Sequence, residues 1–404
     1  MAKILISSLG KGKKNGEYET TVYTIDSKKY EDNSIAAVLV NHLDIDKLFV
    51  LGTGGSAWDT ITNRYGADDA TSLELMEKLE KSEVSQDDLQ EMGELIDKHF
   101  GINGSKAWII EYGIDQKELW HNFEIFLEVG RMIEDGDEVY LDITHSFRSL
   151  PMMSFVMMEF ASQISEIDFK LAGIYYGMYE YSKDPRNIEG GTPIVDIGII
   201  YELHQWIRAI DAMKNYGNLE PLVKLMDEWY NDEEDAEKVF VQLNNTIKMA
   251  NLASIKQFVG SARKKINRLK NSNNPVVGLL SKDIEDFVQR LDKEKMSDFQ
   301  YELAKWFYDN KQYALSYMAL AEAVITKACE IKGYNISSKE GREAGKNYIK
   351  QTKYDDYFSQ KYPNSVSRIR NNIAHQLNGR EGMVNQDIVQ LGEFLKNFDP
   401  FFAQ

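Results

Sequence analysis

Residues 138–145, EVYLDITH, decide how the first half of this chain is expected to fold. The stretch begins as a short run of apolar, β-branched and aromatic residues and ends in polar side chains, which is typical of a buried strand that stops at a loop. After the loop, residues 150–164 form a longer apolar segment with helical spacing. A strand, a polar loop and a helix in this order predict one strand–helix unit of an α/β fold.

The same pattern extends through the first 200 residues. Similar short apolar runs occur at residues 3–7, 47–51, 107–111 and 169–176. Amphipathic segments between them lie at residues 72–83, 86–100 and 116–134. Alternating strands and helices predict a mostly parallel sheet with helices on both faces. Residues 18–26 are expected to form an early hairpin or edge strand, and residues 194–199 a last strand.

From residue 201 onward the strand signals stop. Apolar residues recur there at helical spacing in successive segments as far as residue 397. The sequence therefore predicts two domains: an α/β domain at residues 1–200 and an all-helical domain at residues 201–404.

Composition excludes several classes of protein. The 404 residues include 47 Lys and Arg against 64 Asp and Glu, and the formal net charge of −17 argues against bulk attraction to nucleic acid or anionic membrane. Cys329 is the single cysteine, which rules out a disulfide framework within the chain and argues against a cysteine-based zinc site. The N-terminus lacks the apolar run of a secretory signal, and no stretch approaches 18 apolar residues. We expect a cytoplasmic protein with no membrane partner.

Two basic stretches stand out in this acidic chain. Residues 252–281 contain six Lys and Arg and no acid, and residues 361–380 contain four Arg and Lys and again no acid. The stretches are either solvated helix faces or a local surface for RNA.

Three strand ends predict a ligand crevice. Polar and glycine-rich loops begin near Ser8 and Gly10, near Thr53 and Gly54, and at residues 142–148. In a parallel sheet, ligands lie beyond the carboxyl ends of the strands, where glycine lets the backbone approach them closely. Each loop is also consistent with an ordinary turn between a strand and a helix.

The helical half contains one compact candidate for chemistry. Arg370 and His375 lie five residues apart, within a turn and a half of a predicted helix. Cleavage of RNA by its own 2′-hydroxyl needs a proton acceptor and a cation beside the phosphorane, roles that suit histidine and arginine and require no metal. Asn371 is placed to orient either group. The alternative is a structural helix with a surface Arg and a buried His.

Motifs of other enzyme classes are absent or incomplete. The six histidines form no HxxxH pair, and neither GxSxG nor GxxxxGK[ST] occurs. Residues 52–57 fit G-x-G-x-x-A, but no acid follows at the end of a second strand, which disfavours a dehydrogenase.

Three motifs resemble one protein family. D-I-T-H-S-F-R-S-L-P at residues 142–151 resembles the D-x-T-H-G signature of type III CRISPR accessory proteins, which join a Rossmann-like CARF domain to a helical HEPN domain. L-G-T-G-G-S-A-W-D at residues 51–59 is similar to the second ligand loop of that family. R-N-N-I-A-H at residues 370–375 matches the HEPN ribonuclease motif. Ser146 stands where the family pattern usually has Gly.

The resemblance implies an endoribonuclease that cuts single-stranded RNA without a metal or cofactor and is activated by a cyclic oligoadenylate, with the tetra-adenylate ring favoured. It also implies a homodimer or a higher assembly of dimers, because a symmetric ring suits an isologous pair of crevices. Catalysis is expected from Arg370, His375 and Asn371. The residues expected to bind the ring are Ser8, Gly10, Thr53, Gly54, Ser56, Thr144, His145 and Arg148.

Three alternatives remain open. The first is a sensor with an inactive HEPN half. The second is a ring nuclease that degrades its messenger with a loop Ser, Thr or His145. The third is a nucleotide-dependent metabolic enzyme.

Overall fold

The computed structural model divides the chain into two compact units, Met1–Tyr201 and Glu202–Gln404. The structure describes all residues except 11–12, 15–16, 19, 146–148, 165–168, 189, 230–233, 250, 272–274 and 376–382. Among the described residues, no helix is both long enough and apolar enough to cross a membrane.

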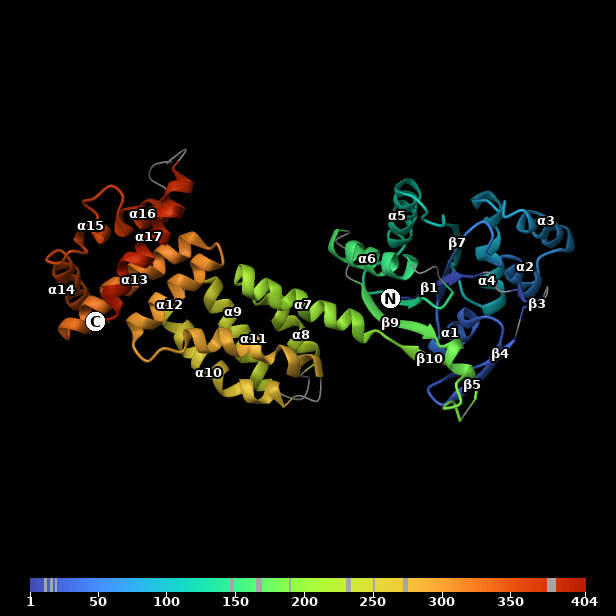
Figure 1. Cartoon of the computed structure of the whole chain (residues 1–404), viewed down its shortest axis with the longest axis horizontal. Coiled ribbons are helices and arrows are strands. Elements are labelled where there is room, and N and C mark those ends of the chain that lie inside the picture. The colour runs from blue at the N-terminus through green and yellow to red at the C-terminus, as the bar shows by residue number, and fades with distance from the viewer. Residues whose placement is uncertain are drawn as a thin grey trace. The chain divides into compact units, whose positions relative to one another are not determined.

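An eight-stranded sheet forms the centre of the first unit (Figure 1). Its strand order is β5-β4-β10-β9-β8-β1-β6-β7, and the five strands from β9 to β7 are parallel to one another. The strand bounds are Lys3–Leu9 (β1), Thr21–Ile25 (β4), Lys28–Asp32 (β5), Lys47–Gly52 (β6), Lys106–Ile109 (β7), Glu138–Asp142 (β8), Lys170–Gly177 (β9) and Thr192–Asp196 (β10). Two short strands, Lys13–Lys14 (β2) and Glu17–Tyr18 (β3), form a separate pair.

The parallel strands are apolar on both faces because helices cover both. Leu5 of β1 packs in one buried cluster with Trp58, while its neighbours Ile4 and Ile6 pack in another with Phe126. In Figure 1, α5 and α6 lie on one side of the sheet and α1, α2 and α4 on the other. The helix bounds are Ile35–Leu43 (α1), Asp59–Tyr65 (α2), Asp69–Glu80 (α3), Met92–Phe100 (α4), Gln116–Gly130 (α5) and Ser149–Ile164 (α6), with short 3₁₀ turns at Gln86–Leu89 (η1) and Tyr179–Lys183 (η2).

The edge of the sheet differs in detail from the sequence expectation. The predicted early hairpin is β4 and β5, joined at Asp26 and Ser27, which both have positive φ, as a tight two-residue hairpin turn requires. The last strand, β10, begins at Thr192, ends at Asp196 and runs antiparallel to β9. Helix α7, Ile199–Tyr216, starts where the sequence analysis still expected strand.

Every regular element in the described part of the second unit is a helix. The bounds are Glu220–Trp229 (α8), Glu234–Lys248 (α9), Leu252–Lys270 (α10), Pro275–Leu291 (α11), Met296–Asp309 (α12), Tyr313–Lys332 (α13), Lys339–Ile349 (α14), Asp355–Phe358 (α15), Val366–His375 (α16) and Val384–Phe402 (α17). Helix α13 is buried along most of its length and contacts α12, α14, α16 and α17 (Figure 1). The structure thus confirms the predicted fold class, a mostly parallel α/β sheet followed by an all-helical region.

Candidate functional site

The strand order predicts a ligand crevice at the carboxyl end of β1. On one side of β1 lie β6 and β7, and on its other side lie β8 and β9, which come later in the chain. Helices therefore leave neighbouring strand ends toward opposite faces at the β1–β8 junction, where α/β sheets bind ligands. The three predicted loops follow β1, β6 and β8, so the fold brings them to the same edge.

A buried carboxylate ties the ends of β1 and β8 together. Ser7 Oγ donates a hydrogen bond to Asp142 Oδ2 at 2.6 Å, and the Thr144 amide donates to Asp142 Oδ1 at 3.0 Å. Both Ser7 and Asp142 are buried. Burial, and after it the negative charge of Asp142, raises the pKa of Tyr23 to about 12, so this phenol stays neutral beside the carboxylate. Asp142 therefore fixes the direction in which the Thr144–His145 loop leaves the sheet.

Gly10 lies where the three loops meet. Its carbonyl accepts a hydrogen bond from the Ala57 amide of the second loop at 2.9 Å. On its other side, a Cβ atom at Gly10 would lie 2.9 Å from His145 Cβ of the third loop. Only glycine allows this approach, because real Cβ atoms are not found so close to another carbon atom.

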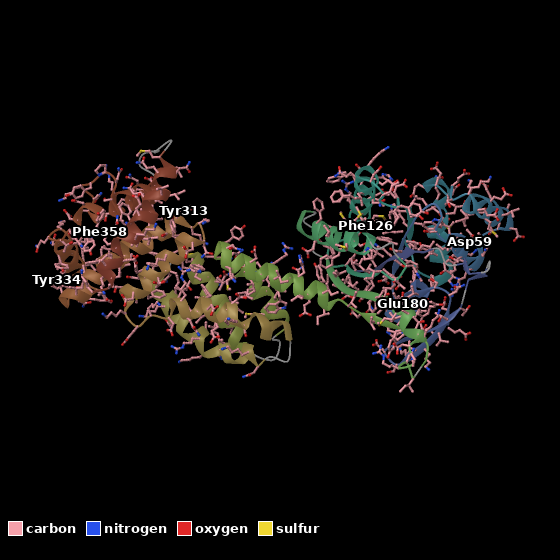
Figure 2. The ribbon with its side chains drawn as sticks, in the orientation of Figure 1. Asp59, Phe126, Glu180, Tyr313, Tyr334 and Phe358 are labelled. Carbon is pink, nitrogen blue, oxygen red and sulfur yellow. The ribbon has the colours of Figure 1, made fainter. Side chains whose placement is uncertain are left out.

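The second loop is held together by its own polar groups. Ser56 Oγ accepts a hydrogen bond from the Thr53 amide at 2.9 Å and lies 3.3 Å from Thr53 Oγ1. Trp58 Nε1 donates to the Thr53 carbonyl at 2.9 Å. Thr53 and Ser56 are each 1 % exposed, and Gly54 packs against the carbonyl of Val84. These residues shape the loop that leads into α2, whose first residue is Asp59 (Figure 2).

The remaining candidates differ in how open they are. His145 is exposed, Thr144 is half-buried with its hydroxyl accepting from the Gly177 amide at 2.9 Å, and Ser8 is 9 % exposed. Gly10, Thr144 and His145 are thus brought together as open groups of the crevice. Arg148 and Ser146 lie outside the described residues. Ser7 and Asp142 were not predicted as site residues, although both lie at the ends of predicted strands.

In the second unit, Arg370 lies at a cavity of about 460 Å³. Its Nη1 donates to Asn371 Oδ1 at 3.0 Å, and within the described residues its buried Nε has no hydrogen-bond partner. His375, the last residue of α16, is exposed and does not line this cavity. Within one chain, the structure therefore brings Arg370 and Asn371 together at the cavity, and His375 is not part of this cavity.

The two basic stretches differ in their surroundings. On α10, Lys256 donates to the Glu294 carbonyl, Arg263 pairs with Asp292, and Lys270 lies 2.7 Å from Glu285. These contacts neutralise or occupy three of the six basic side chains of the first stretch. In the second stretch, Arg368 is exposed, and Arg380 lies outside the described residues. Among the residues that the structure describes, no group of three His, Cys, Asp or Glu could hold a metal ion.

Comparison with known proteins assigns the first unit and the start of the second. Residues 4–185 match the family model of the CARF domain of the CRISPR system endoribonuclease Csx1. Residues 202–298 match that of the second domain of CRISPR-associated protein MJ1674. The chain is 32% identical to CRISPR-associated protein MJ1674 of Methanocaldococcus jannaschii over 436 residues, which cover 98% of this chain. The chain is a CARF-containing accessory protein of type III CRISPR systems.

This CARF protein spans 66% of the length of that relative. A solved structure of Enterococcus italicus Csm6 bound to cyclic hexa-2′-fluoro-hexa-dAMP is 14% identical, with coverage of 99% of this chain and 94% of that chain and a TM-score of 0.40. The CARF match contains all three strand-end loops, whereas neither family match reaches α16.

Proposed function

We propose that this CARF protein is a cyclic oligoadenylate-activated endoribonuclease of single-stranded RNA that needs no metal. The observation that carries the proposal is the joining, in one chain, of a CARF domain to a helical unit whose α16 bears Arg370 and His375. We further propose that this helical unit, residues 201–404, is a HEPN-like ribonuclease domain.

The proposed ligand site is the crevice around Gly10, Thr144 and His145. Backbone that comes close to a ligand, a hydroxyl and an exposed imidazole suit the phosphates and bases of an adenylate ring. Ser8, Thr53, Gly54 and Ser56 act in this proposal by holding the loops in place, since they are buried or packed against other residues. Arg148 supplies the bidentate cation for phosphate.

The proposed assembly is a homodimer in which two crevices share one ring. Helix α6 begins just beyond the third loop, and its side chains Met152 and Val156 are 73% and 59% exposed. Trp120 of α5 is 65% exposed. Large exposed apolar side chains of this kind favour a protein contact, here with a second copy of the chain.

The proposed chemistry is attack of the RNA 2′-hydroxyl on the adjacent phosphorus. His375 takes the hydroxyl proton, and the bond to the 5′-oxygen breaks with a proton supplied to that oxygen by a second acid, which leaves a 2′,3′-cyclic phosphate and a 5′-hydroxyl. Arg370 stabilises the charge on the phosphorane oxygens, and Asn371 holds the guanidinium through the hydrogen bond described above. His375 lies at the exposed end of α16. In the proposed dimer, the His375 and Arg370 side chains of the two subunits meet across a shared cleft.

The test is cleavage of labelled RNA in EDTA, with and without cyclic oligoadenylates of several sizes. The proposal predicts cleavage with the messenger, fragments that end in 2′,3′-cyclic phosphate, and no cleavage by His375→Ala. RNA that stays intact with every messenger would refute it.

One observation favours a second candidate, a ring nuclease in the CARF domain. His145 is exposed at the crevice and close to Gly10. Loss of the messenger in His375→Ala protein, abolished by adding His145→Ala, would establish this activity.

A further inference from the structure

The cavity beside Arg370 has a distinctive wall. It lies within the second unit among α13, α14, α15 and α16, and Phe358, labelled in Figure 2, belongs to its lining. The lining residues are Ala321, Glu322, Ile325, Arg342, Glu343, Lys346, Lys350, Phe358, Ser359, Gln360, Lys361, Ser367, Arg370 and Asn371.

The helices that form the cavity approach one another closely. A Cβ atom at Gly345 of α14 would lie 2.7 Å from Cys329 Sγ of α13, so a side chain at position 345 would push the two helices apart. The Cys329 thiol also donates to the Gly341 carbonyl at 3.4 Å. This contact brings the lysines of α14 to the same cavity as Arg370.

Basic side chains outnumber acidic ones in the lining, although the chain has a net charge of −17. Two of the basic side chains are in ion pairs, Arg342 with Glu322 and Lys361 with Asp355. Lys346 of α14 and Lys350, which directly follows the last residue of α14, lie one helical turn apart. Like charges at this spacing destabilise a helix by a few tenths of a kcal/mol. Lys346 lies 3.3 Å from Glu343, and Lys350 donates to the neutral Asn347 side chain at 3.0 Å. Two lysines close together, with Glu343 as the acidic partner of one of them, favour an anion as the occupant of the cavity.

The rest of the cavity suits a nucleotide better than a bare phosphate. Ile325 and Phe358 contribute apolar surface, and the amides of Gln360 and Asn371 offer donors and acceptors. A volume of about 460 Å³ falls within the range of small-molecule sites. Splayed-out bases of single-stranded RNA are recognised by such combinations of apolar and amide contacts.

We propose that this cavity binds one nucleotide of the substrate RNA next to the cleaved bond, with its phosphate on Lys346 and Lys350. The inference rests on the proposed ribonuclease function and adds a specific RNA subsite to it. Lys346 and Lys350 belong to neither of the two basic stretches, whereas Lys361 and Arg370 of the same wall belong to the second. The sequence therefore indicated only part of the subsite.

The test is binding of a 2′-O-methyl RNA, which cannot be cleaved because its 2′-oxygen is blocked, to the full chain with messenger present. Fluorescence anisotropy compares wild type, Lys346→Ala/Lys350→Ala, and the control Lys282→Ala/Lys339→Ala, which removes two exposed lysines outside the cavity. Removing the two lysines that hold this phosphate is expected to lower the slope of log affinity against log salt by about 0.7, the contribution of one neutralised phosphate of a single strand. The control pair is expected to keep the wild-type slope.

The outcomes separate this inference from the proposed function. If wild type binds and cleaves RNA, and the salt dependence of RNA affinity has the same slope in Lys346→Ala/Lys350→Ala as in Lys282→Ala/Lys339→Ala, the subsite alone is overturned. Wild type that neither binds nor cleaves RNA would overturn both. AMP that binds through the same two lysines while RNA binding ignores them would identify a free-nucleotide site and overturn the RNA subsite.

Discussion

Single residues decide how the crevice of the CARF domain is built. Asp142 accepts hydrogen bonds from Ser7 and Thr144 across the β1–β8 junction, and Gly10 fits between the second and third loops. The exposed candidates are few because most polar groups of these loops already bond one another. Removing one such group is expected to move a loop as well as delete a contact.

Gly10→Ala is expected to weaken binding of the cyclic tetra-adenylate at least tenfold. The added methyl would lie 2.9 Å from His145 Cβ, so the third loop must shift, at a cost of about 1–3 kcal/mol. Isothermal titration calorimetry measures the affinity. Gly130→Ala, where the nearest atom is at 3.4 Å, is the matched control, and equal affinities of the two variants would contradict the role of Gly10.

Arg370→Lys is expected to slow RNA cleavage about 100-fold while leaving messenger binding intact. The substitution keeps one positive charge but loses the planar fork that can contact two phosphorane oxygens. Single-turnover cleavage with saturating messenger measures the rate. Arg290→Lys on α11, which keeps a cation beside Asp309 of α12, serves as the control. A rate within threefold of wild type would remove Arg370 from the proposed chemistry.

At the scale of elements, strands were easier to predict than sites. Residues 3–7, 47–51 and 138–143 were predicted from continuous apolar runs, which a parallel sheet buried on both faces requires. Helices α1 and α2 were missed, since α1 is too uniformly apolar to show a clear stripe and α2 has only seven residues. The Ser7–Asp142 contact joins residues 135 apart in the chain, and the cavity joins α14 to α16, so local patterns contain neither.

The link between α15 and α16 depends on an ion pair at the edge of the cavity. Lys361 lies 2.5 Å from Asp355, and Ser359 also donates to this carboxylate. Burial alone would raise the pKa of Asp355, but the hydrogen bonds from Lys361 and Ser359 outweigh it, and the pKa is lowered. A lowered pKa in the folded state means that the carboxylate stabilises the fold above its unfolded pKa of about 3.9 and loses this effect as pH falls below it.

Asp355→Asn is therefore expected to lower the free energy of unfolding by about 1 kcal/mol at pH 7, a value kept small by solvent screening. At pH 3 the difference from wild type is expected to shrink, because the wild-type carboxylate then begins to protonate. Urea unfolding at both pH values measures it. A difference that is the same at both pH values would show that the charge of Asp355 contributes nothing.

At the scale of the whole molecule, the proposal couples a sensing unit to a cleaving unit in one chain. The messenger can shift the equilibrium toward the cleaving state only by as much as it prefers that state. The acidic net charge then disfavours indiscriminate RNA binding, and the basic wall of the cavity supplies local attraction.

The proposed dimer predicts that Met152→Glu/Val156→Glu is monomeric at micromolar concentration and binds the ring at least tenfold more weakly. Burying two carboxylates in a shared apolar contact costs more than such a contact supplies. Mass photometry measures the assembly, and Leu73→Glu, at another exposed apolar side chain, is the control. A double variant with the mass of wild type would place the dimer contact elsewhere.

The most direct test of the account is the rate of RNA cleavage in EDTA as the cyclic tetra-adenylate is titrated into wild type, Gly10→Ala and His375→Ala. We predict that wild type cleaves only with messenger, that Gly10→Ala needs at least tenfold more messenger to reach the same rate, and that His375→Ala binds the messenger without cleaving. Cleavage that is independent of the messenger, or that persists in His375→Ala, would contradict the account.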